Sequence, residues 1–525
     1  MPPASNDIAG RQHRRVIEFL GDPQSHHPVP NSVERLETHG AIVFLAGGLA
    51  YKIKKAVRFD YMDFSTLELR RRICLRELEL NRPHAPDIYL DVVAITQDLD
   101  GRLAIGGTGE PIEWCVRMRR FAQSDLLSTI ADNDELDPDL CRQLAAAVVT
   151  YHRSSPVAAG MEYANRVNGI ADDICRQLHP HMAQLGAVDG ERLGDRLRQE
   201  VERVGPILRR RGQGGFVRRV HGDLHLGNIV LWEGKPVLFD AIEFNEDIAT
   251  IDTLHDLAFL LMDLDRRGQR AAANRIMNHY LWLSRAPSDI EALAALPLFL
   301  SLRAGVRAMV SLQRAMQKPA ASRSEDLGQS IGYLRCTAGY LEHPEAALIA
   351  VGGYSGTGKS TLAAALAPHV GAAPGALLVR SDLERKALFN CAETQRLAPS
   401  TYTSESSARV YAVMLEKAES AVRAGQAVIV DAVFARQNER AAVEQLAQLL
   451  GVPFRGLWLE APPAVLRTRV AGRRDDASDA TVEVVDRQLA RDTGPIAWTR
   501  LASGESRAGL VTAALAELHG VVGRC

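Results

Sequence analysis

A glycine-rich loop between an apolar segment and a helix-forming segment constrains this chain more than any other feature of its sequence. Residues 353–361 read Gly-Tyr-Ser-Gly-Thr-Gly-Lys-Ser-Thr. The apolar residues 346–351 precede the loop, and the Leu- and Ala-rich residues 362–367 follow it. A strand, a glycine loop with Lys-Ser and a helix, in this order, form a phosphate-binding loop. The sequence therefore predicts a nucleoside triphosphate site.

Each part of this loop has an expected role. Backbone N–H groups and the positive end of the following helix surround the phosphate oxygens. We expect Lys359 to reach the β- and γ-phosphates and Ser360 to bind Mg²⁺, with ATP as the nucleotide. The residues expected to contact the nucleotide are Gly353, Tyr354, Ser355, Gly356, Thr357, Gly358, Lys359, Ser360 and Thr361.

Length and charge limit the classes of protein that this chain can form. Its 525 residues are enough for two or more domains, each with its own core. With 62 basic and 64 acidic residues, the net charge of −2 disfavours nucleic acid or an anionic membrane as a partner. The seven cysteines are scattered without a Cys-x-x-Cys pair, which argues against a disulfide framework. With no signal-peptide pattern and no apolar stretch of membrane-spanning length, we expect a cytoplasmic protein.

The sequence pattern divides the chain into two predicted domains, residues 1–342 and residues 343–525. The first domain begins with a β-rich part and continues as a mostly helical part, which residues 220–244 interrupt with a hairpin. In the second domain, four short apolar strands alternate with helices, a pattern that predicts a parallel sheet covered by helices on both faces. The predicted strands are residues 347–351, 376–379, 427–430 and 456–459.

A second chemical motif lies inside the predicted hairpin region. Residues 221–228 read His-Gly-Asp-Leu-His-Leu-Gly-Asn, and Asp240 follows at the end of an apolar strand. Phosphoryl-transfer catalytic loops space an Asp, an Asn and a second Asp in this way. We expect Asp223 to orient the acceptor hydroxyl or accept its proton, and Asn228 and Asp240 to hold Mg²⁺.

Residues 40–300 resemble the aminoglycoside phosphotransferase family, which is related to the protein kinases. The resemblance implies an α+β bilobal kinase-like fold, with a lysine on the phosphates and a helix Glu that holds it. We expect Lys52 to be this lysine, with Lys54 on the same strand face as the alternative, and Glu77 to be its partner. Residues 112–118 are expected to read the adenine through their backbone. Nothing in the sequence marks an aminoglycoside site, so the family name does not indicate the substrate.

The second domain is similar to the gluconate-kinase, chloramphenicol-phosphotransferase and zeta-toxin relatives, which have an α/β three-layer P-loop fold. This resemblance implies that Asp382 contacts or deprotonates the acceptor hydroxyl and that Arg385 binds the substrate. Asp431 ends an apolar strand, the usual place for a residue that holds Mg²⁺ and its water shell. Asp382 as a helix cap is the alternative for that residue.

A run of arginines near residue 470 resembles the lid of adenylate-kinase-like proteins. Lid arginines close over the transferred phosphoryl group and exclude water. We expect Arg473 to contact the nucleotide, although the choice among these arginines stays open, and a solvated charged face is the alternative. The arginines are Arg467, Arg469, Arg473 and Arg474.

The whole chain resembles fused bacterial proteins that join an aminoglycoside phosphotransferase-like domain to a P-loop ATP-binding domain. The resemblance implies a cytoplasmic, bifunctional ATP-dependent kinase with two ATP–Mg²⁺ sites, acting on hydroxyl groups of small molecules. One alternative is a single active kinase domain with the other domain regulatory. A zeta-toxin-like kinase is another alternative. A P-loop module that acts on nucleic-acid ends or on protein is a further one, and the near-zero net charge disfavours its nucleic-acid version.

Overall fold

The computed structural model describes residues 4–59, 62–186, 189–472, 477–504 and 506–519. Contacts between Cα atoms group the chain into two compact units. Unit 1 consists of Met1–Leu136, Thr150–Gly160 and Gly215–Asp256, and unit 2 consists of Asp137–Val149, Met161–Gly214 and Leu257–Cys525. This grouping follows contacts alone, and the domain boundary between residues 342 and 343 stays a prediction.

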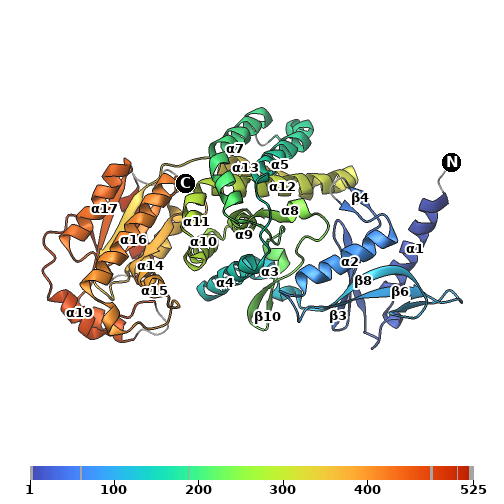
Figure 1. Ribbon diagram of the computed structural model, residues 1–525, viewed down its shortest axis with the longest axis horizontal. Coiled ribbons are helices and arrows are strands. Elements are labelled where there is room, and N and C mark those ends of the chain that lie inside the picture. The colour runs from blue at the N-terminus through green and yellow to red at the C-terminus, as the bar shows by residue number, and fades with distance from the viewer. Residues whose placement is uncertain (1–3, 60–61, 187–188, 473–476, 505, 520–525) are drawn as a thin grey trace. The chain divides into compact units, whose positions relative to one another are not determined.

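Unit 1 contains a six-stranded antiparallel sheet with the strand order β1-β2-β3-β8-β6-β7 (Figure 1). The helix α1 (Ala4–Gly21) precedes the sheet. Apolar side chains of β2, β3 and β8 form the core on one face, where Phe44, Ile53 and Cys115 are fully buried. The strands are β1 (Val33–Glu37), β2 (Ala41–Ala46), β3 (Leu49–Lys54), β6 (Tyr89–Gln97), β7 (Leu103–Ile105) and β8 (Glu110–Arg119).

The helix α2 (Leu67–Asn81) packs on this sheet and brings one acidic residue into the interior. It begins at its N-cap Thr66, whose hydroxyl accepts a hydrogen bond from the backbone N–H of Leu69 at 3.2 Å. Its buried residues recur at helical spacing, so they share one face. These residues are Arg70, Ile73, Cys74, Glu77 and Asn81.

Two short antiparallel pairs carry the loop that contains the His-Gly-Asp motif. One strand of each pair flanks the motif, since β9 ends before it and β10 begins directly after it. The predicted hairpin is confirmed, and its second strand ends two residues before Asp240. The strands are β9 (Val217–Arg219), β10 (Ile229–Trp232), β11 (Lys235–Leu238) and β12 (Thr250–Asp252), and the nearby short helices are α3 (Leu127–Asp132) and α8 (Glu246–Ala249).

Much of unit 2 before the phosphate loop is helical. One helical stretch, Pro287–Gln317, is long and apolar enough to cross a membrane, but 78% of its most apolar window is buried inside the protein, as in a core helix. It is the only such stretch in the described ranges. The helices are α4 (Pro138–Ser154), whose last turns belong to unit 1, α9 (Thr253–Arg266), whose first turn up to Asp256 belongs to unit 1, and α5 (Tyr163–Leu178), α6 (Met182–Leu185), α7 (Gly190–Gln213), α10 (Arg270–Ser284), α11 (Pro287–Glu291), α12 (Leu296–Gln317) and α13 (Ser324–Tyr340).

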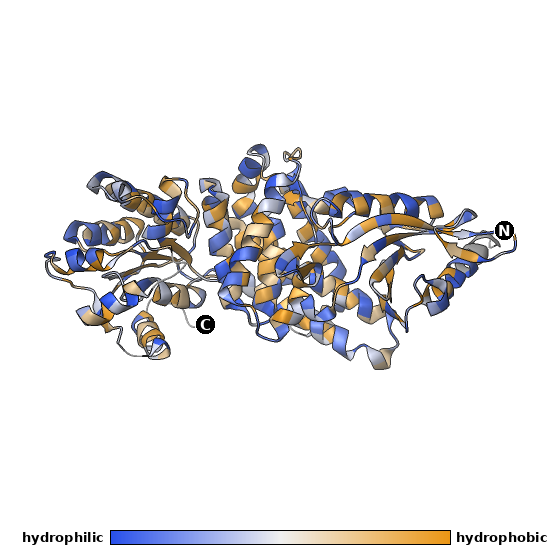
Figure 2. Ribbon diagram, turned by 90° about the horizontal axis from the view of Figure 1, so that it is seen from below, coloured by the Kyte–Doolittle hydropathy of each residue, from blue (hydrophilic) through white to orange (hydrophobic). Residues whose placement is uncertain are grey.

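The C-terminal part of unit 2 contains a five-stranded parallel sheet with the order β14-β15-β13-β16-β17. Figure 2 shows hydrophobic residues along these strands and mixed faces on the surrounding helices. The strands are β13 (Leu348–Gly353), β14 (Leu377–Arg380), β15 (Val428–Asp431), β16 (Phe454–Glu460) and β17 (Thr499–Ala502). The helices are α14 (Lys359–Leu366), α15 (Ser381–Leu388), α16 (Ser404–Arg423), α17 (Gln437–Leu450), α18 (Pro463–Ala471), α19 (Val482–Leu489) and α20 (Arg507–Leu518).

The predicted fold class is confirmed: an α+β kinase-like part precedes an α/β P-loop part with a parallel sheet. The four predicted parallel strands correspond to β13, β14, β15 and β16. The sequence did not indicate β17, because this edge strand buries only Leu501 and therefore lacks an apolar run.

Gly456 in β16 has no space for a side chain. A Cβ atom at this position would lie 2.3 Å from Cγ of Trp498. Because the indole would have to shift, we expect Gly456→Ala to lower the free energy of unfolding of unit 2 by about 1–3 kcal/mol. Urea unfolding followed by tryptophan fluorescence measures this difference.

Gly504→Ala is the matched control, since no described atom beyond its chain neighbours lies within 4 Å of a Cβ built there. The control is expected to unfold like the wild type. A Gly456→Ala variant with the wild-type midpoint would contradict the described packing around Trp498.

Candidate functional site

Two buried lysines of β3 share one carboxylate in unit 1. Nζ of Lys52 lies 2.8 Å from Oε1 of Glu77, and Nζ of Lys54 lies 2.6 Å from Oε2 of the same side chain. Each lysine also pairs with a carboxylate that follows β11, Lys52 with Asp240 and Lys54 with Glu243. The period of two along β3 places both lysines on one face of the sheet, and α2 delivers Glu77 to that face.

The charges in this cluster depend on one another. Burial, the largest influence, would raise the pKa of Glu77, but Lys52 and Lys54 outweigh it and lower the pKa to about 2. Burial would likewise lower the pKa of Lys52, yet Asp240 and Glu77 raise it well above its ordinary value. Burial raises the pKa of Glu243 against the opposing charge of Lys54. Removal of one member therefore leaves an uncompensated buried charge.

Hydrogen bonds from unit 1 also hold the backbone around Asp240. The backbone N–H of Asp240 donates to the hydroxyl of Tyr89 at 3.1 Å. Oδ1 of Asn81 accepts from the N–H of Ala241 at 2.8 Å, and Nδ2 of Asn81 donates to the carbonyl of Glu77 at 2.9 Å. Asp240 has φ +61°, a conformation that non-glycine residues adopt rarely and that is common at functional sites. The helix α2 and the segment after β11 are thus connected through Asn81.

The His-Gly-Asp turn is built on a fully buried acid from α9. Oδ1 of Asp256 accepts from the N–H of Gly222 at 2.9 Å, and Oδ2 lies 3.1 Å from Nε2 of His152. Gly222 has φ +82°, and a Cβ there would lie 3.1 Å from Ala249. Burial lowers the pKa of His221, whose Nε2 lies 2.9 Å from the carbonyl of Phe239. His221 is therefore neutral, and its ring connects the turn to the carbonyl of Phe239.

Asp223 emerges from this turn with its carboxylate held by two neighbours. Nδ2 of Asn228 donates to the carbonyl and to Oδ2 of Asp223, each at 3.0 Å. Nε2 of His225 lies 3.4 Å from Oδ2 of Asp223. Because Nδ1 of His225 accepts from the N–H of Gly227 at 3.1 Å, Nε2 carries the proton. The Asp223 side chain remains 37% exposed, so a substrate hydroxyl can reach it.

The expectation that residues 112–118 read the adenine is wrong. These residues lie inside β8 (Glu110–Arg119), and residues 115–118 pair with β3 on one side and β6 on the other. The backbone groups of residues 115–118 are used by the sheet on both sides, and residues 112–118 form no connecting segment between elements.

The phosphate loop in unit 2 has the backbone conformation that its glycines allow. Gly353, Gly356 and Gly358 have φ values of +136°, +89° and +89°, and Gly358 is the N-cap of α14. Nζ of Lys359 donates to the carbonyl of Tyr354 at 3.1 Å. The conformation is typical of a loop that directs backbone N–H groups at an anion.

Two residues of α18 and α19 contact this loop. Gln488 accepts from the N–H of Ser355 at 2.8 Å and donates to its hydroxyl at 3.1 Å. Arg469 donates to the carbonyl of Ser503 at 2.8 Å and contacts the carbonyl of Gly356 at 3.4 Å. Arg469 is therefore hydrogen-bonded to backbone carbonyls near the loop. Gln488 was not predicted from the sequence, because a single Gln in a helix belongs to no motif.

The acidic residues predicted for the second site lie at the carboxyl ends of β14 and β15. Asp431 is buried, and its Oδ2 lies 3.5 Å from Nε of Arg380. Burial and the negative charge of Asp431 raise the pKa of Asp382, which Arg380 and Lys359 oppose. The N-cap of α15 is Arg380, so Asp382 lies in the first turn and is not the cap. Asp382, Asp431 and Lys359 are therefore within electrostatic reach of one another.

Arginine 385 and the arginines after β16 have different surroundings. Arg385 is buried, stacks on Tyr402 at 4.7 Å and donates to Ser407 Oγ at 3.2 Å. Arg467 is 47% exposed and pairs with Asp486 of α19 at 2.8 Å. Arg473, like Arg474, lies outside the described residues.

Within the described part of the chain, no group of three or more His, Cys, Asp or Glu side chains is arranged to hold a metal ion. Mg²⁺ is usually bound by one or two carboxylates together with phosphate oxygens and water. Asn228 and Asp240 in unit 1, and Ser360 and Asp431 in unit 2, offer oxygen atoms of this kind.

Glu243 is the main residue of the first site that sequence reasoning missed. Its signal was its place three residues after Asp240 in Asp-Ala-Ile-Glu, but the partner Lys54 is 189 residues away in the chain. Lys52 and Lys54, left open by the sequence, differ in this second partner: Lys52 contacts Asp240 and Lys54 contacts Glu243.

The depressed pKa of Glu77 predicts a specific pH dependence of stability. A carboxyl with a folded pKa of about 2 and an ordinary value of 4.5 stabilises the fold above pH 4.5 and loses this contribution as the pH falls towards 2. Between pH 5 and pH 3.5, Glu77 is expected to account for about 1 kcal/mol of lost unfolding free energy. Urea unfolding at both pH values measures the loss.

Glu77→Gln is expected to flatten this pH dependence by that amount. Glu79→Gln is the control, because Glu79 lies on the same helix with a side chain that is 68% exposed. If Glu77→Gln and Glu79→Gln lose the same free energy between the two pH values, the ionised state of Glu77 in the folded protein is refuted.

Comparisons with known proteins find matches for both parts of the chain. Residues 348–495 match an AAA domain, and residues 77–296 match the phosphotransferase enzyme family. Uncharacterized proteins from Mycobacterium bovis and from two Mycobacterium tuberculosis strains are 29% identical over 488 residues, which cover 89% of this chain and 93% of each relative.

Solved structures with local similarity include kinases of both kinds. An aminoglycoside 2'-phosphotransferase-IIIa in complex with GDP is 15% identical, with 62% of this chain and 98% of that chain covered and a TM-score of 0.37. A sugar kinase from Janibacter sp. is 21% identical, with 34% and 100% covered and a TM-score of 0.27. A gluconokinase from Sinorhizobium meliloti is 20% identical, with 34% and 95% covered and a TM-score of 0.25.

The resemblance predicted from the two motif sets is therefore confirmed: residues 77–296 match the phosphotransferase enzyme family, and residues 348–495 of the same chain match an AAA domain.

Proposed function

We propose that this chain is an ATP-dependent phosphotransferase with two separate Mg²⁺–ATP sites, each of which transfers a phosphoryl group to a hydroxyl of a small molecule. The observation that carries the proposal is the contact of Lys52 with both Glu77 and Asp240 beside the Asp223–Asn228 loop. The family matches support kinase activity. We place the boundary between the two domains between residues 342 and 343. We also propose that the protein acts in the cytoplasm.

In the first site, the chain itself supplies a phosphate-binding cation and a base. Lys52 is held by Glu77, so its ammonium group is positioned to bind nucleotide phosphates. Asn228 and His225 hold Asp223 so that its carboxylate can accept the proton of an acceptor hydroxyl. Asn228 and Asp240 would hold Mg²⁺, which neutralises phosphate charge when bound. Catalysis then consists of positioning and electrostatic stabilisation.

In the second site, the phosphate loop and Lys359 bind the triphosphate, and Asp382 acts on the acceptor. Because burial and Asp431 raise the pKa of Asp382, this carboxylate is a stronger base than an exposed Asp. Ser360 and Asp431 would hold Mg²⁺. Arg385 and the arginines of the lid, including Arg473, complete the proposed site.

Loss of one product per mutated site is the direct test of two kinase activities. We expect Asp223→Asn to lower formation of one phosphorylated product by about 10²–10⁴-fold, because the proton acceptor is removed. Lys359→Met is expected to remove a different product by at least about 10²-fold, because a cation on the transferred phosphoryl group is lost. Full-length protein, a desalted metabolite extract and γ-labelled ATP are combined, and labelled products are resolved by mass spectrometry.

Asp100→Asn, at an exposed loop carboxylate, controls for the change in charge. Loss of one and the same product in both variants, without a stalled intermediate, would show that only one site transfers phosphate and that the other is regulatory. Growth arrest on expression of residues 343–525 would favour the zeta-toxin-like alternative.

The two lysines of β3 are expected to have separable roles. Lys52→Met should lower turnover at the first site by at least about 10²-fold, because Lys52 alone contacts both Glu77 and Asp240. Lys54→Met should lower the unfolding free energy by about 3–5 kcal/mol, because Glu243 and Glu77 lose a buried partner. Turnover of the Asp223-dependent product and urea unfolding measure the two effects. Equal turnover in the wild type and Lys52→Met would show that Lys52 is not the lysine that binds the nucleotide phosphates.

A further inference from the structure

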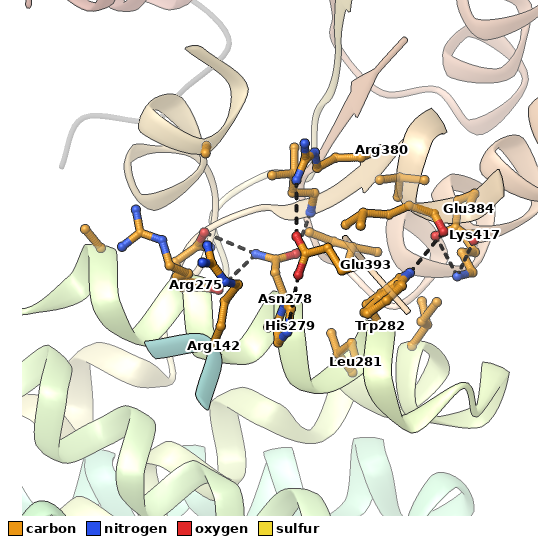
Figure 3. A pocket seen from close by; sticks show the side chains of 18 residues that line it. Arg142, Arg275, Asn278, His279, Leu281, Trp282, Arg380, Glu384, Glu393 and Lys417 are labelled. Atoms are coloured by element: carbon orange, nitrogen blue, oxygen red, sulfur yellow. Dashed lines mark hydrogen bonds and ion pairs between the residues drawn. The ribbon is translucent and has the colours of Figure 1, made fainter. Parts of the chain in front are cut away.

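A cavity of about 140 Å³ in unit 2 lies between α10 and the edge strand β14 (Figure 3). One water needs roughly 10–15 Å³ of such volume, so the cavity can hold a small molecular group. It is outside the phosphate loop, and none of the roles proposed above requires it. Leu377, Leu378, Val379 and the start of α15 form one wall, and α10 forms the other.

Hydrogen bonds between the two walls give this cavity a defined shape. Asn278 accepts from the N–H of Leu378 at 2.6 Å, and its Nδ2 donates to the carbonyl of Ala376 at 3.2 Å. Nδ2 of Asn274 donates to the same carbonyl at 3.0 Å. Nε1 of Trp282 donates to the carbonyl of Leu383 at 3.2 Å. Side-chain amides of α10 thus satisfy backbone groups that an edge strand leaves unpaired.

The lining of the cavity carries more positive than negative charge. Four cations, Arg142, Arg275, Arg380 and Lys417, face two carboxylates. Glu384 is neutralised by Lys417, whose Nζ lies 2.7 Å from it.

The second carboxylate, Glu393, lies between two basic groups. It is 4.0 Å from Nη1 of Arg380 and 3.7 Å from Nε2 of His279. Two arginines therefore remain beyond the ion pairs between lining residues. Arg142 pairs with Asp139 of its own helix at 2.6 Å. Arg275 forms a hydrogen bond with the thiol of Cys141, and among the described residues it has no carboxylate partner.

Arg380 connects this cavity to the phosphate-loop site. Its Nε lies 3.5 Å from Oδ2 of Asp431 on one side, and its Nη1 faces Glu393 in the cavity on the other. Nε is buried and its distance to Asp431 is too long for a hydrogen bond, and Nη1 lies 4.0 Å from Glu393, so neither carboxylate forms a close contact with the guanidinium group.

We propose that this cavity binds a small anion, a phosphate or carboxylate group, through Arg275, Arg142 and Arg380. Arginine suits this ligand because its planar N–H donors match the oxygen atoms of phosphate and carboxylate groups. The hydrogen bonds of Asn274 and Asn278 to β14 and the residue before it keep the two walls of the cavity in place. Glu393 pairs with Arg380 while the anion is absent. The anion is either part of the acceptor of the second site or a separate ligand. The proposal concerns binding and does not depend on which reaction the phosphate loop performs.

Calorimetric titration of the full chain with inorganic phosphate tests the site, with Mg²⁺ and a non-hydrolysable ATP analogue at saturation so that the nucleotide sites are filled. We expect one phosphate per chain, and at least about tenfold weaker binding in Arg275→Gln, because a charge-assisted hydrogen bond is lost. Arg142→Gln, at the partly exposed end of the cavity, should weaken binding in the same direction.

Glu393→Gln provides a test of opposite sign, since it removes the carboxylate that competes for Arg380. This variant is expected to bind phosphate at least about threefold more tightly than the wild type, a result that a damaged fold cannot produce. Arg423→Gln is the matched control, because Arg423 is 61% exposed on α16, the helix that carries Lys417. No phosphate binding by the wild type, or equal affinity in Arg275→Gln and Arg423→Gln, would overturn the proposal.

Kinetics of the Lys359-dependent product distinguish the two sources of the anion. If the anion is part of the acceptor, phosphate competes with the acceptor, and Arg275→Gln raises KM with little change in kcat. If the anion is a separate ligand, phosphate changes kcat without competing. Both results support the site. Failure of the two-kinase proposal would remove this product but would leave the calorimetric result intact.

Discussion

The carboxylate of Glu77, divided between two buried lysines, is the interaction on which the first site depends. One oxygen holds Lys52 and the other holds Lys54, and each lysine continues to an acid that follows β11. This arrangement joins a strand, a helix and the segment around Asp240 through charges in a medium where an unpaired charge is costly. The position of Lys52 is therefore determined by packing as well as by its own pairing. Lys54 gives Glu77 a second partner that does not depend on Lys52.

The second site relies on backbone groups where the first site relies on buried ion pairs. The phosphate loop uses backbone N–H groups and the N-terminus of α14, and contacts from Arg469 and Gln488 support the loop. Its acids, Asp382 and Asp431, lie next to Arg380, which also faces the cavity beside α10. The guanidinium group of Arg380 therefore faces both Asp431 and that cavity.

Sequence reasoning succeeded where a chemical role requires a fixed local spacing. The phosphate loop, the His-Gly-Asp turn and the four apolar strands of the parallel sheet were all visible, because each depends on neighbours within a few residues. Sequence reasoning failed for segments whose position in a sheet depends on backbone pairing and not on a side-chain motif. Residues 112–118 lie inside the strand β8, of which residues 115–118 pair on both edges, and β17 is too polar to be recognised. Glu243 was not predicted because an acid three residues beyond Asp240 belongs to no recognised motif, and its partner Lys54 is 189 residues away along the chain.

The sequence by itself determined the two motif sets, the order of the two parts and the alternation that produces a parallel sheet. It also limited the β3 lysine to two candidates, because a period of two places Lys52 and Lys54 on one face. Only the tertiary structure decided which acid each lysine meets, since Asp240 and Glu243 are almost 190 residues away along the chain. The same holds for the cavity beside α10, whose arginines come from α4, α10 and β14. Long-range charge pairing is decided by packing, and no local pattern encodes it.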